Sequence, residues 1–494
     1  MQSDFKNVTI LILITLCLGI FLIATTAVIA KDGTIFIQYA KSISASPRQT
    51  MIQEYQHPGY PVLILAATKI VGLFYKGGQL FLFIYSAQAA SLLFRILSII
   101  VLYFIAKEIV GTKFAFWAMI ILIILPKPAE YGSDVLSDWP HMFFLAAGML
   151  ALLYGAKFGK WWYFAIAGLA GGLGYLIRPE GAQVVIYGFW WLLLQLVWNK
   201  RIIKKSHAVL GLISMLIIFI ITVSPYMKLK GAIFPKKGVG TFSSMGILPM
   251  YPLAGSSHYG SEDFQAGIVP SKVAGGVFKI FENTGDTLLW FFLLPYFIGI
   301  YLHFKKHKLL EPNQFFIVSL VIVNVPLMIW LYNSHGYMSD RHTFPLVVFT
   351  LFFIPTGIQA WSLWLNKRYS KGFEHTHRWF AILMTIGIAI CIPRLFMSLH
   401  PDKLYYRAAA RWLAQNTESS SILAVPDYRI SFYAERFGIK MTEDNIPEAA
   451  QYLVKIAGKK EIEKGIILPH FDKVFSVEDN KGKKEILIFK RISE

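Results

Sequence analysis

One stretch of sequence decides the fold: residues 80–106 read LFLFIYSAQAASLLFRILSIIVLYFIA, with Arg95 as the single charged side chain. A helix needs about 20 apolar residues to cross the hydrocarbon core of a bilayer. Similar runs recur as far as residue 399, and Pro126 and Pro128 interrupt the third of them, residues 114–131. We therefore expect an all-α polytopic membrane bundle of about eleven spans: 8–30, 80–106, 114–131, 139–156, 161–177, 181–198, 208–227, 287–304, 315–332, 343–365 and 379–399.

The composition agrees with a membrane protein. Of the 494 residues, 55% are hydrophobic and 16% are charged, whereas a soluble domain carries about 25% charged residues. These figures exclude soluble, disordered, collagen-like and coiled-coil chains. Cys17 and Cys391 both lie within apolar runs, so the sequence predicts neither a disulfide scaffold nor a cysteine metal site.

The basic residues predict how the chain is oriented. Residues 61–75 form a short apolar run that contains Lys69, so we expect an interfacial or re-entrant helix there. If the N-terminus is inside, the inner loops then hold fifteen Lys and Arg residues and the short outer connections only three, Lys127, Arg178 and Arg341. This bias predicts a cytoplasmic N-terminus and an external C-terminus. It also explains the net charge of +19 without nucleic-acid binding.

The first span has a second interpretation. Val28, Ile29 and Ala30 resemble a signal-peptide cleavage site. However, the apolar run 8–30 is longer than the 7–15 residues usual for a signal peptide. The sequence therefore favours an uncleaved anchor.

The outer part of the protein is expected to consist of loop 31–79, loop 228–286 and a soluble tail. We divide the chain into a membrane domain, residues 1–399, and a small C-terminal α/β domain, residues 400–494. The absence of internal repeats and of an inverted pair of broken helices argues against a secondary transporter. In the tail the patterns predict helices 402–416 and 447–457 and strands 421–426, 465–468, 473–477 and 485–490.

Acidic and basic residues gather at the outer ends of the spans. Together with a soluble cap, they indicate a site at the boundary between lipid and water. These residues are Asp32 after the first span, His57 in the first outer loop, Glu130, Asp134 and Asp138 between the third and fourth spans, Arg178 and Glu180 between the fifth and sixth, and Asp340 and Arg341 before the tenth.

Each carboxylate also has a structural interpretation. Asp32 could be a solvated residue at the end of a helix. Asp134 and Asp138 are four residues apart, so on a helix they would share a face. Asp138 could equally cap the fourth span.

The cations have alternatives of their own. Arg178 could form a structural ion pair with Glu180, and Arg341 could extend toward lipid head groups. Arg95 is either a functional charge inside the membrane, where charges are costly, or reaches the outer surface because its span begins later. The glycines at 168–174 indicate close helix packing, not a ligand loop.

Four motifs carry a resemblance to a known family. They are HPGYP at 57–61, AKEIVG at 106–111, SDVLSD at 133–138 and GLAGGLGYLIRPEG at 168–181. Their order and spacing resemble those of GT-C glycosyltransferases, in particular the bacterial branch with protein O-mannosyltransferase-like and aminoarabinose-transferase-like membrane domains. The resemblance covers about residues 1–200. The chain departs from the pattern at Gly59, where many members have a second proline, and at Arg95, where small or apolar residues are usual.

The resemblance implies a transferase that takes a sugar from a polyprenyl-phosphate carrier on the outer face. In this family an acidic residue just after the first span is the expected base, and Asp32 matches it. Asp138, with Asp134, matches an acidic position of the site between the third and fourth spans. Arg178 and Arg341 are candidates to hold the carrier phosphate, and His57, Glu180 and Arg95 are further candidates for binding substrate.

The chemistry agrees with this expectation. A sugar on a carrier phosphate already has a good leaving group, so the protein needs a base for the acceptor hydroxyl and fixed cations for the developing negative charge. A single displacement inverts the anomeric centre and needs one carboxylate. No phosphate-binding glycine loop is present in the sequence, which favours a lipid-linked donor over a nucleotide sugar.

The predicted partners are thus a polyprenyl-phosphate-sugar donor and an envelope glycan, lipid or protein acceptor, at the periplasmic face of a bacterial inner membrane. Asp32 and Asp138 could share a divalent metal as oxygen ligands, and the sequence indicates no specific cofactor. A polysaccharide polymerase or ligase that uses a lipid carrier, and a transporter, remain as alternatives. The sequence specifies neither the sugar nor the acceptor.

Overall fold

The computed structural model describes residues 2–197, 202–231, 270–369, 376–441, 446–463, 466 and 468–492. Most of the expected outer loop 228–286 lies outside these residues, as do parts of the expected strand 465–468. The membrane part consists of α1 (Gln2–Ala24), α5 (Gln79–Val110), α6 (Thr112–Ile124), α7 (Pro126–Tyr131), α8 (Asp138–Phe158), α9 (Trp161–Ile177), η1 (Pro179–Ala182), α10 (Gln183–Val197), α11 (Lys205–Lys230), α13 (Leu293–Lys306), α14 (Pro312–His335), α15 (Asp340–Thr350), η2 (Leu351–Phe353), α16 (Ile354–Tyr369) and α17 (Thr376–Leu395).

The helical pattern confirms the predicted membrane bundle. Eight helical segments among the described residues are long and apolar enough to cross a membrane, and each coincides with a predicted span. The other three predicted spans correspond to shorter helices. The third is broken into α6 and α7 at Pro126, the fifth is α9, and the eighth is α13, which begins only at Leu293 because residues 288–292 form a turn.

The first span ends earlier than the sequence predicts. We expected it to run to residue 30, but α1 ends at Ala24. Val28 and Ile29 are fully buried: Val28 packs into the core of the C-terminal unit, and Ile29 packs into the core that α2 (Lys31–Ala45) and α4 (Gly59–Phe74) form with the outer ends of α5 and α9. The last residues of this apolar run are therefore apolar because they fill cores beyond the end of α1, and not because they belong to the first span.

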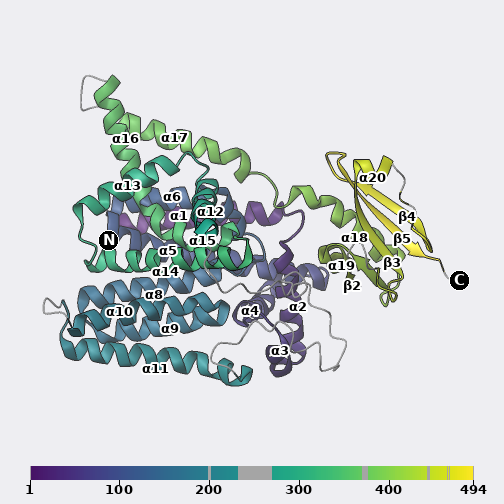
Figure 1. The fold of residues 1–494 in the computed structure, drawn as a ribbon, viewed down its shortest axis with the longest axis horizontal. Coiled ribbons are helices and arrows are strands. Elements are labelled where there is room, and N and C mark those ends of the chain that lie inside the picture. The colour runs from purple at the N-terminus through teal and green to yellow at the C-terminus, as the bar shows by residue number, and fades with distance from the viewer. Residues whose placement is uncertain are drawn as a thin grey trace.

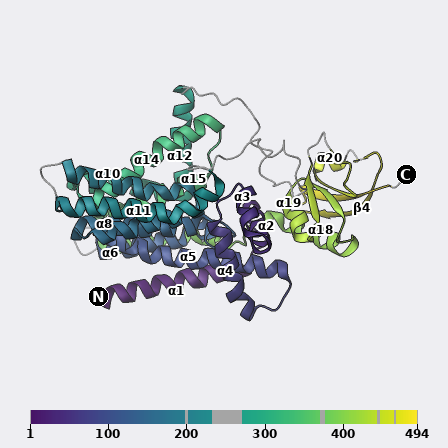
Figure 2. The ribbon, with the colours of Figure 1, turned by 90° about the horizontal axis from the view of Figure 1, so that it is seen from below.

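The outer elements all lie at one end of the bundle. Helices α2 (Lys31–Ala45), α3 (Pro47–Gln53) and α4 (Gly59–Phe74) sit beyond the ends of α9 and α11. The N-terminus lies at the opposite end of the bundle, whereas the C-terminal sheet projects from the same end as α2 and α3 (Figure 1, Figure 2). Helix α12 (Pro270–Thr287) leads into α13.

The C-terminal residues form the expected small α/β unit. Its sheet has the order β2-β1-β3-β5-β4, in which β2, β1 and β3 are parallel and β5 is antiparallel to both β3 and β4. Helices α18 and α19 cover one face. Its elements are η4 (Pro401–Lys403), α18 (Leu404–Asn416), β1 (Ile422–Val425), α19 (Tyr428–Ala434), β2 (Phe437–Lys440), β3 (Tyr452–Gly458), α20 (Lys459–Glu463), β4 (Phe471–Glu478) and β5 (Lys484–Arg491).

One helix prediction in this unit is wrong. Residues 447–457 were expected to be helical, but Tyr452–Gly458 forms the central strand β3. The run Leu453, Val454 and Ile456 pairs with β5 along its whole length. Tertiary pairing thus overrides the helical preference of the preceding alanines.

The glycines at 168–174 pack helices closely, as predicted. A Cβ atom at Gly168 would lie 2.3 Å from the backbone oxygen of Met215 in α11, and one at Gly172 would lie 2.7 Å from Thr222. Since the obstacle at Gly168 is backbone, the neighbour cannot move aside without shifting α11.

We therefore predict that Gly168→Ala lowers the free energy of unfolding by about 1–3 kcal/mol, the usual cost of overpacking a core. Gly78→Ala is the matched control, because its Cβ would meet no atom within 4 Å. Thermal unfolding of the purified protein in detergent measures both. Equal midpoints for the two variants would contradict the packing assignment.

Candidate active site

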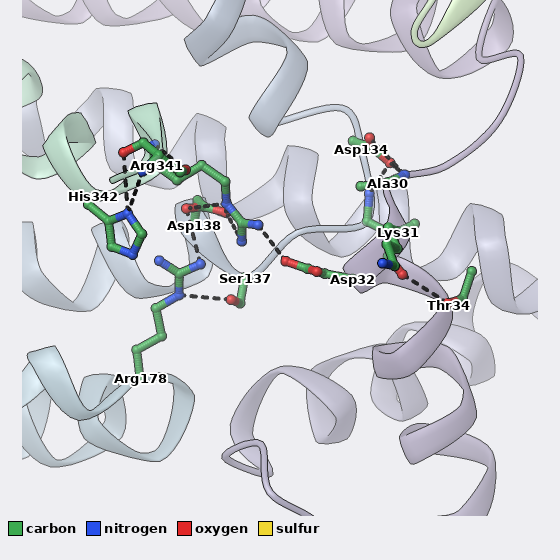
Figure 3. A network of polar contacts seen from close by, with 12 residues as sticks. Ala30, Lys31, Asp32, Thr34, Asp134, Ser137, Asp138, Arg178, Arg341 and His342 are labelled. Carbon is green, nitrogen blue, oxygen red and sulfur yellow. Dashed lines mark hydrogen bonds and ion pairs between the residues drawn. The ribbon is translucent and has the colours of Figure 1, made fainter. Parts of the chain in front are cut away.

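The site is built around one buried carboxylate. Asp138, the first residue of α8, has 1% of its side chain exposed and is bound by two arginines. Arg178 Nη2 lies 3.1 Å from its Oδ1, and Arg341 Nη2 lies 2.8 Å from its Oδ2. Arg341 Nε also donates to both oxygens, at 3.2 and 3.0 Å. Figure 3 shows both guanidinium groups converging on this carboxylate.

Asp32 completes the network at its solvent side. Arg341 Nη1 donates to Asp32 Oδ2 at 2.5 Å, while Nε and Nη2 of the same guanidinium hold Asp138. The Asp32 side chain is 49% exposed. Two carboxylates and two guanidiniums balance in charge, which is the condition under which buried ions are tolerated.

The local sequence explains how each group is placed. Asp32 and Asp138 lie in the first turns of α2 and α8, where the helix dipole favours negative charge. Arg178 ends α9 in an extended conformation, because the residue before a proline is pushed out of the helical region. Arg341 is the second residue of α15, whose start is capped by Ser339.

Further contacts hold the two arginines. Arg178 Nε donates to Ser137 Oγ at 2.9 Å. Asp340, beside Arg341, forms an ion pair with Lys127 of α7. Arg178 thus forms its ion pair with Asp138 instead of Glu180, and Arg341 binds Asp138 and Asp32 instead of extending toward lipid.

Asp134 is buried but faces other partners. It precedes α8, so it does not share a helix face with Asp138. Its oxygens accept from the backbone N–H of Ala30, at 3.0 Å, and of Val135, at 2.7 Å. His400 Nε2 lies 2.9 Å from Oδ2. Asp134 therefore fixes the segment that leads into Asp32.

The C-terminal unit holds the same segment from the other side. The Ala27 N–H donates to Leu399 O at 3.1 Å, and Arg407 Nη1 donates to Ala27 O at 3.3 Å. The Ile29 N–H donates to Tyr433 Oη at 3.0 Å. Val28 lies fully buried in the core beneath α18 and α19. We call residues 25–30 with these contacts the linker clamp.

Sequence reasoning missed His400 as part of the site. The sequence does give a signal there, because His400 stands before a proline where the composition turns soluble. Burial lowers the pKa of His400, but the hydrogen bond and charge of Asp134, together with Glu130, outweigh this effect and raise its pKa above the usual value.

The remaining predicted residues form no ion pair with the network among the described residues. Glu180 is exposed in η1. His57 packs against Tyr175, with ring centroids 5.1 Å apart. Arg95 is fully buried inside the bundle, where Nη2 donates to Ile123 O at 2.8 Å, and it has no ion pair with an acid among the described residues. It does not reach the outer surface.

The arrangement does not suit a metal shared by Asp32 and Asp138. The Arg341 guanidinium lies between these carboxylates and binds both. Within the described ranges, no group of three or more His, Cys, Asp or Glu residues could hold a metal ion. We therefore derive no step through a metal.

The His400–Asp134 pair predicts a dependence of stability on pH. Because the folded-state pKa of His400 is raised, its contribution is complete below about pH 6.5, the unperturbed value, and is lost as the pH rises through the raised pKa. Relative to His400→Gln, the wild-type protein should be more stable at pH 5.5 by about 1.5–3 kcal/mol, and this difference should shrink by pH 9. His377→Gln, at an exposed position, is the control. A difference that does not change with pH would contradict the assignment.

Comparison with known proteins supports the resemblance found in the motifs. Residues 79–224 match the family model of dolichyl-phosphate-mannose-protein mannosyltransferases. No curated protein matches the chain in sequence.

Two solved structures share the fold over nearly the whole chain. ArnT from Cupriavidus metallidurans, solved bound to undecaprenyl phosphate, has a TM-score of 0.62 at 11% identity, with 97% of each chain covered. The oligosaccharyltransferase AglB from Archaeoglobus fulgidus, in complex with an inhibitory peptide and a dolichol-phosphate, has a TM-score of 0.57 at 12% identity, covering 91% of this chain and 69% of its own. The chain thus has the fold of the GT-C superfamily of membrane glycosyltransferases, as its four motifs predict.

Proposed function

We propose that this protein transfers a sugar from a polyprenyl-phosphate carrier to an acceptor hydroxyl at the outer face of a bacterial inner membrane. The observation that carries the proposal is the network of Asp32, Asp138, Arg178 and Arg341. It lies at the end of the bundle from which the C-terminal sheet projects. The fold supports a lipid-linked donor, because similar structures were solved with undecaprenyl phosphate and with a dolichol-phosphate.

Asp32 is the proposed base. It is the exposed member of the network, so an acceptor can reach it, whereas Asp138 is enclosed by guanidinium groups. The Asp32 carboxylate takes the proton of the acceptor hydroxyl while that oxygen bonds to the anomeric carbon. The bond from the anomeric carbon to the phosphate oxygen breaks, and its electron pair leaves with the carrier phosphate. A single displacement of this kind inverts the anomeric centre.

Arg178 and Arg341 are the proposed phosphate-binding cations. Asp138 orients both arginines, since each donates to its carboxylate. Each arginine side chain is about one quarter exposed. A guanidinium carries five N–H donors, so both arginines retain donors for a ligand. Prepositioned cations of this kind stabilise charge that develops on the leaving phosphate.

The outer location rests on the distribution of basic residues. At the opposite end of the bundle, Lys107 pairs with Asp4 at the start of α1, and Lys157 pairs with Glu108. These belong to the lysine-rich connections that the positive-inside rule assigns to the cytoplasm. The network then faces the periplasm.

We predict that Asp32→Asn lowers transfer by about 10²–10⁴-fold, the usual contribution of a general base. The variant should fold normally, because the side chain is half exposed. Asp402→Asn, an exposed aspartate on the same side, is the matched control and should keep full activity. The assay follows a labelled sugar from polyprenyl phosphate to envelope glycans, lipids and proteins of a strain that lacks this protein.

Retained turnover in Asp32→Asn would remove Asp32 from the role of base. Transfer of a preassembled oligosaccharide in place of one sugar would instead favour a polymerase or ligase.

A further inference from the structure

A second group of polar side chains lies beside the proposed active site, where the outer helices meet the bundle. Here α3 and the turn at His57 contact the ends of α9 and α11 (Figure 1). The His57 ring packs against Tyr175 and Tyr226, with centroids 5.1 and 5.2 Å apart. One turn beyond Tyr226, Lys230 Nζ donates to the backbone oxygens of Ile52 and Glu54.

Four polar atoms of this group have no hydrogen-bond partner among the described residues. They are Tyr39 Oη, Glu54 Oε2, His57 Nδ1 and Tyr226 Oη. Tyr39 is 1% exposed and Tyr226 5% exposed. Tyr39 lies close to both Tyr226 and Glu54, whose charges add to the effect of burial in raising its pKa.

Such a concentration of unpaired groups is unusual. Each buried polar atom left unpaired costs about 1–3 kcal/mol, and folded proteins satisfy most of them. On the same helix as Tyr39, by contrast, Asp32 is paired with Arg341. Four unpaired atoms on elements that pack against one another indicate a place prepared for a polar ligand.

The chemistry of the group favours a neutral ligand over a phosphate. Burial lowers the pKa of His57 to about 4, so the imidazole is uncharged at neutral pH. Burial also raises the pKa of Glu54 to about 7, against the opposing charge of Lys230. The ammonium group of Lys230 is already bonded to two carbonyls. The remaining groups are hydroxyls, a carboxyl, an imidazole nitrogen and aromatic faces, which together suit a ring that carries hydroxyl groups on an apolar frame.

The group is also placed to act together with Asp32. Tyr39 follows Asp32 by seven residues on α2, which corresponds to two helical turns, about 10 Å along the axis, on the same helix face. A ligand held at Tyr39 can therefore extend toward Asp32.

We propose that Tyr39, Glu54, His57 and Tyr226 form a saccharide subsite that holds a sugar ring while another part of the ligand reaches Asp32. The assignment of a sugar rests on the proposed transferase function. The ring can belong to the lipid-linked donor or to a glycan acceptor, and both present the same hydroxyl chemistry.

Binding to the full-length protein in nanodiscs tests the proposal. The probes are methyl glycosides of mannose, glucose, galactose and arabinose, titrated by saturation-transfer NMR. At least one glycoside should bind the wild-type protein, and Tyr39→Phe/Tyr226→Phe should weaken that binding about tenfold or more, because both hydroxyls are lost while the aromatic rings stay. Tyr405→Phe is the matched control, since its hydroxyl is likewise buried but belongs to the C-terminal unit.

Competition distinguishes the two sources of the sugar. Displacement of the glycoside by a sugar-loaded polyprenyl phosphate, but not by undecaprenyl phosphate alone, assigns the subsite to the donor. Simultaneous binding of glycoside and loaded carrier assigns it to the acceptor.

Two results would overturn the subsite: no glycoside bound at tens of millimolar, or binding that the double variant leaves unchanged. Asp32→Asn separates this proposal from the proposed function, because it should keep glycoside binding while losing transfer. If the double variant loses glycoside binding, the subsite is retained. If Asp32→Asn also keeps full transfer, the proposed base is rejected while the subsite stands.

Discussion

The structure depends on the burial of one charge. Asp138 is enclosed at the start of α8, and a carboxylate in that position is tolerated only if cations reach it. Arg178 arrives from the end of α9 and Arg341 from the start of α15, so the requirement fixes how three helices meet. Arg341 then extends the network to Asp32 at the start of α2. The same contacts that neutralise a buried charge thus bring the proposed base and two cations to one end of the bundle.

The C-terminal unit contributes to this arrangement through the linker clamp. It surrounds residues 25–30 by hydrogen bonds from Arg407 and to Tyr433, and by burial of Val28 in its own core. His400 joins it to Asp134, which binds the backbone of Ala30. Because Ala30 stands two residues before Asp32, the soluble unit sets the position of the proposed base. This gives the tail a structural role that its composition alone does not suggest.

The sequence predicted the bundle well because hydropathy is a local property, and each predicted span coincides with helical structure. It also placed Asp32, Asp138, Arg178 and Arg341 in one site. However, it included His57, Glu180 and Arg95 in that site as well, and it did not predict which residues pair. That pairing joins residues up to 309 positions apart, and no local pattern encodes such a contact. The same limit explains the errors at residues 25–30 and 447–457. Both are apolar segments whose partners, the outer core and β5, lie far away in the sequence.

A double-mutant cycle between Asp138 and Arg341 tests the central claim most directly. Asp138→Asn, Arg341→Gln and the double variant are compared by the free energy of unfolding in detergent. Arg341→Gln leaves Asp138 with Arg178 as its one arginine, and Asp138→Asn leaves Arg341 with Asp32 as its one carboxylate, so each should cost stability. The double variant should cost less than the sum by about 0.5–3 kcal/mol, the range for residues in contact. Strictly additive losses would show that the two side chains act independently, and would contradict the account.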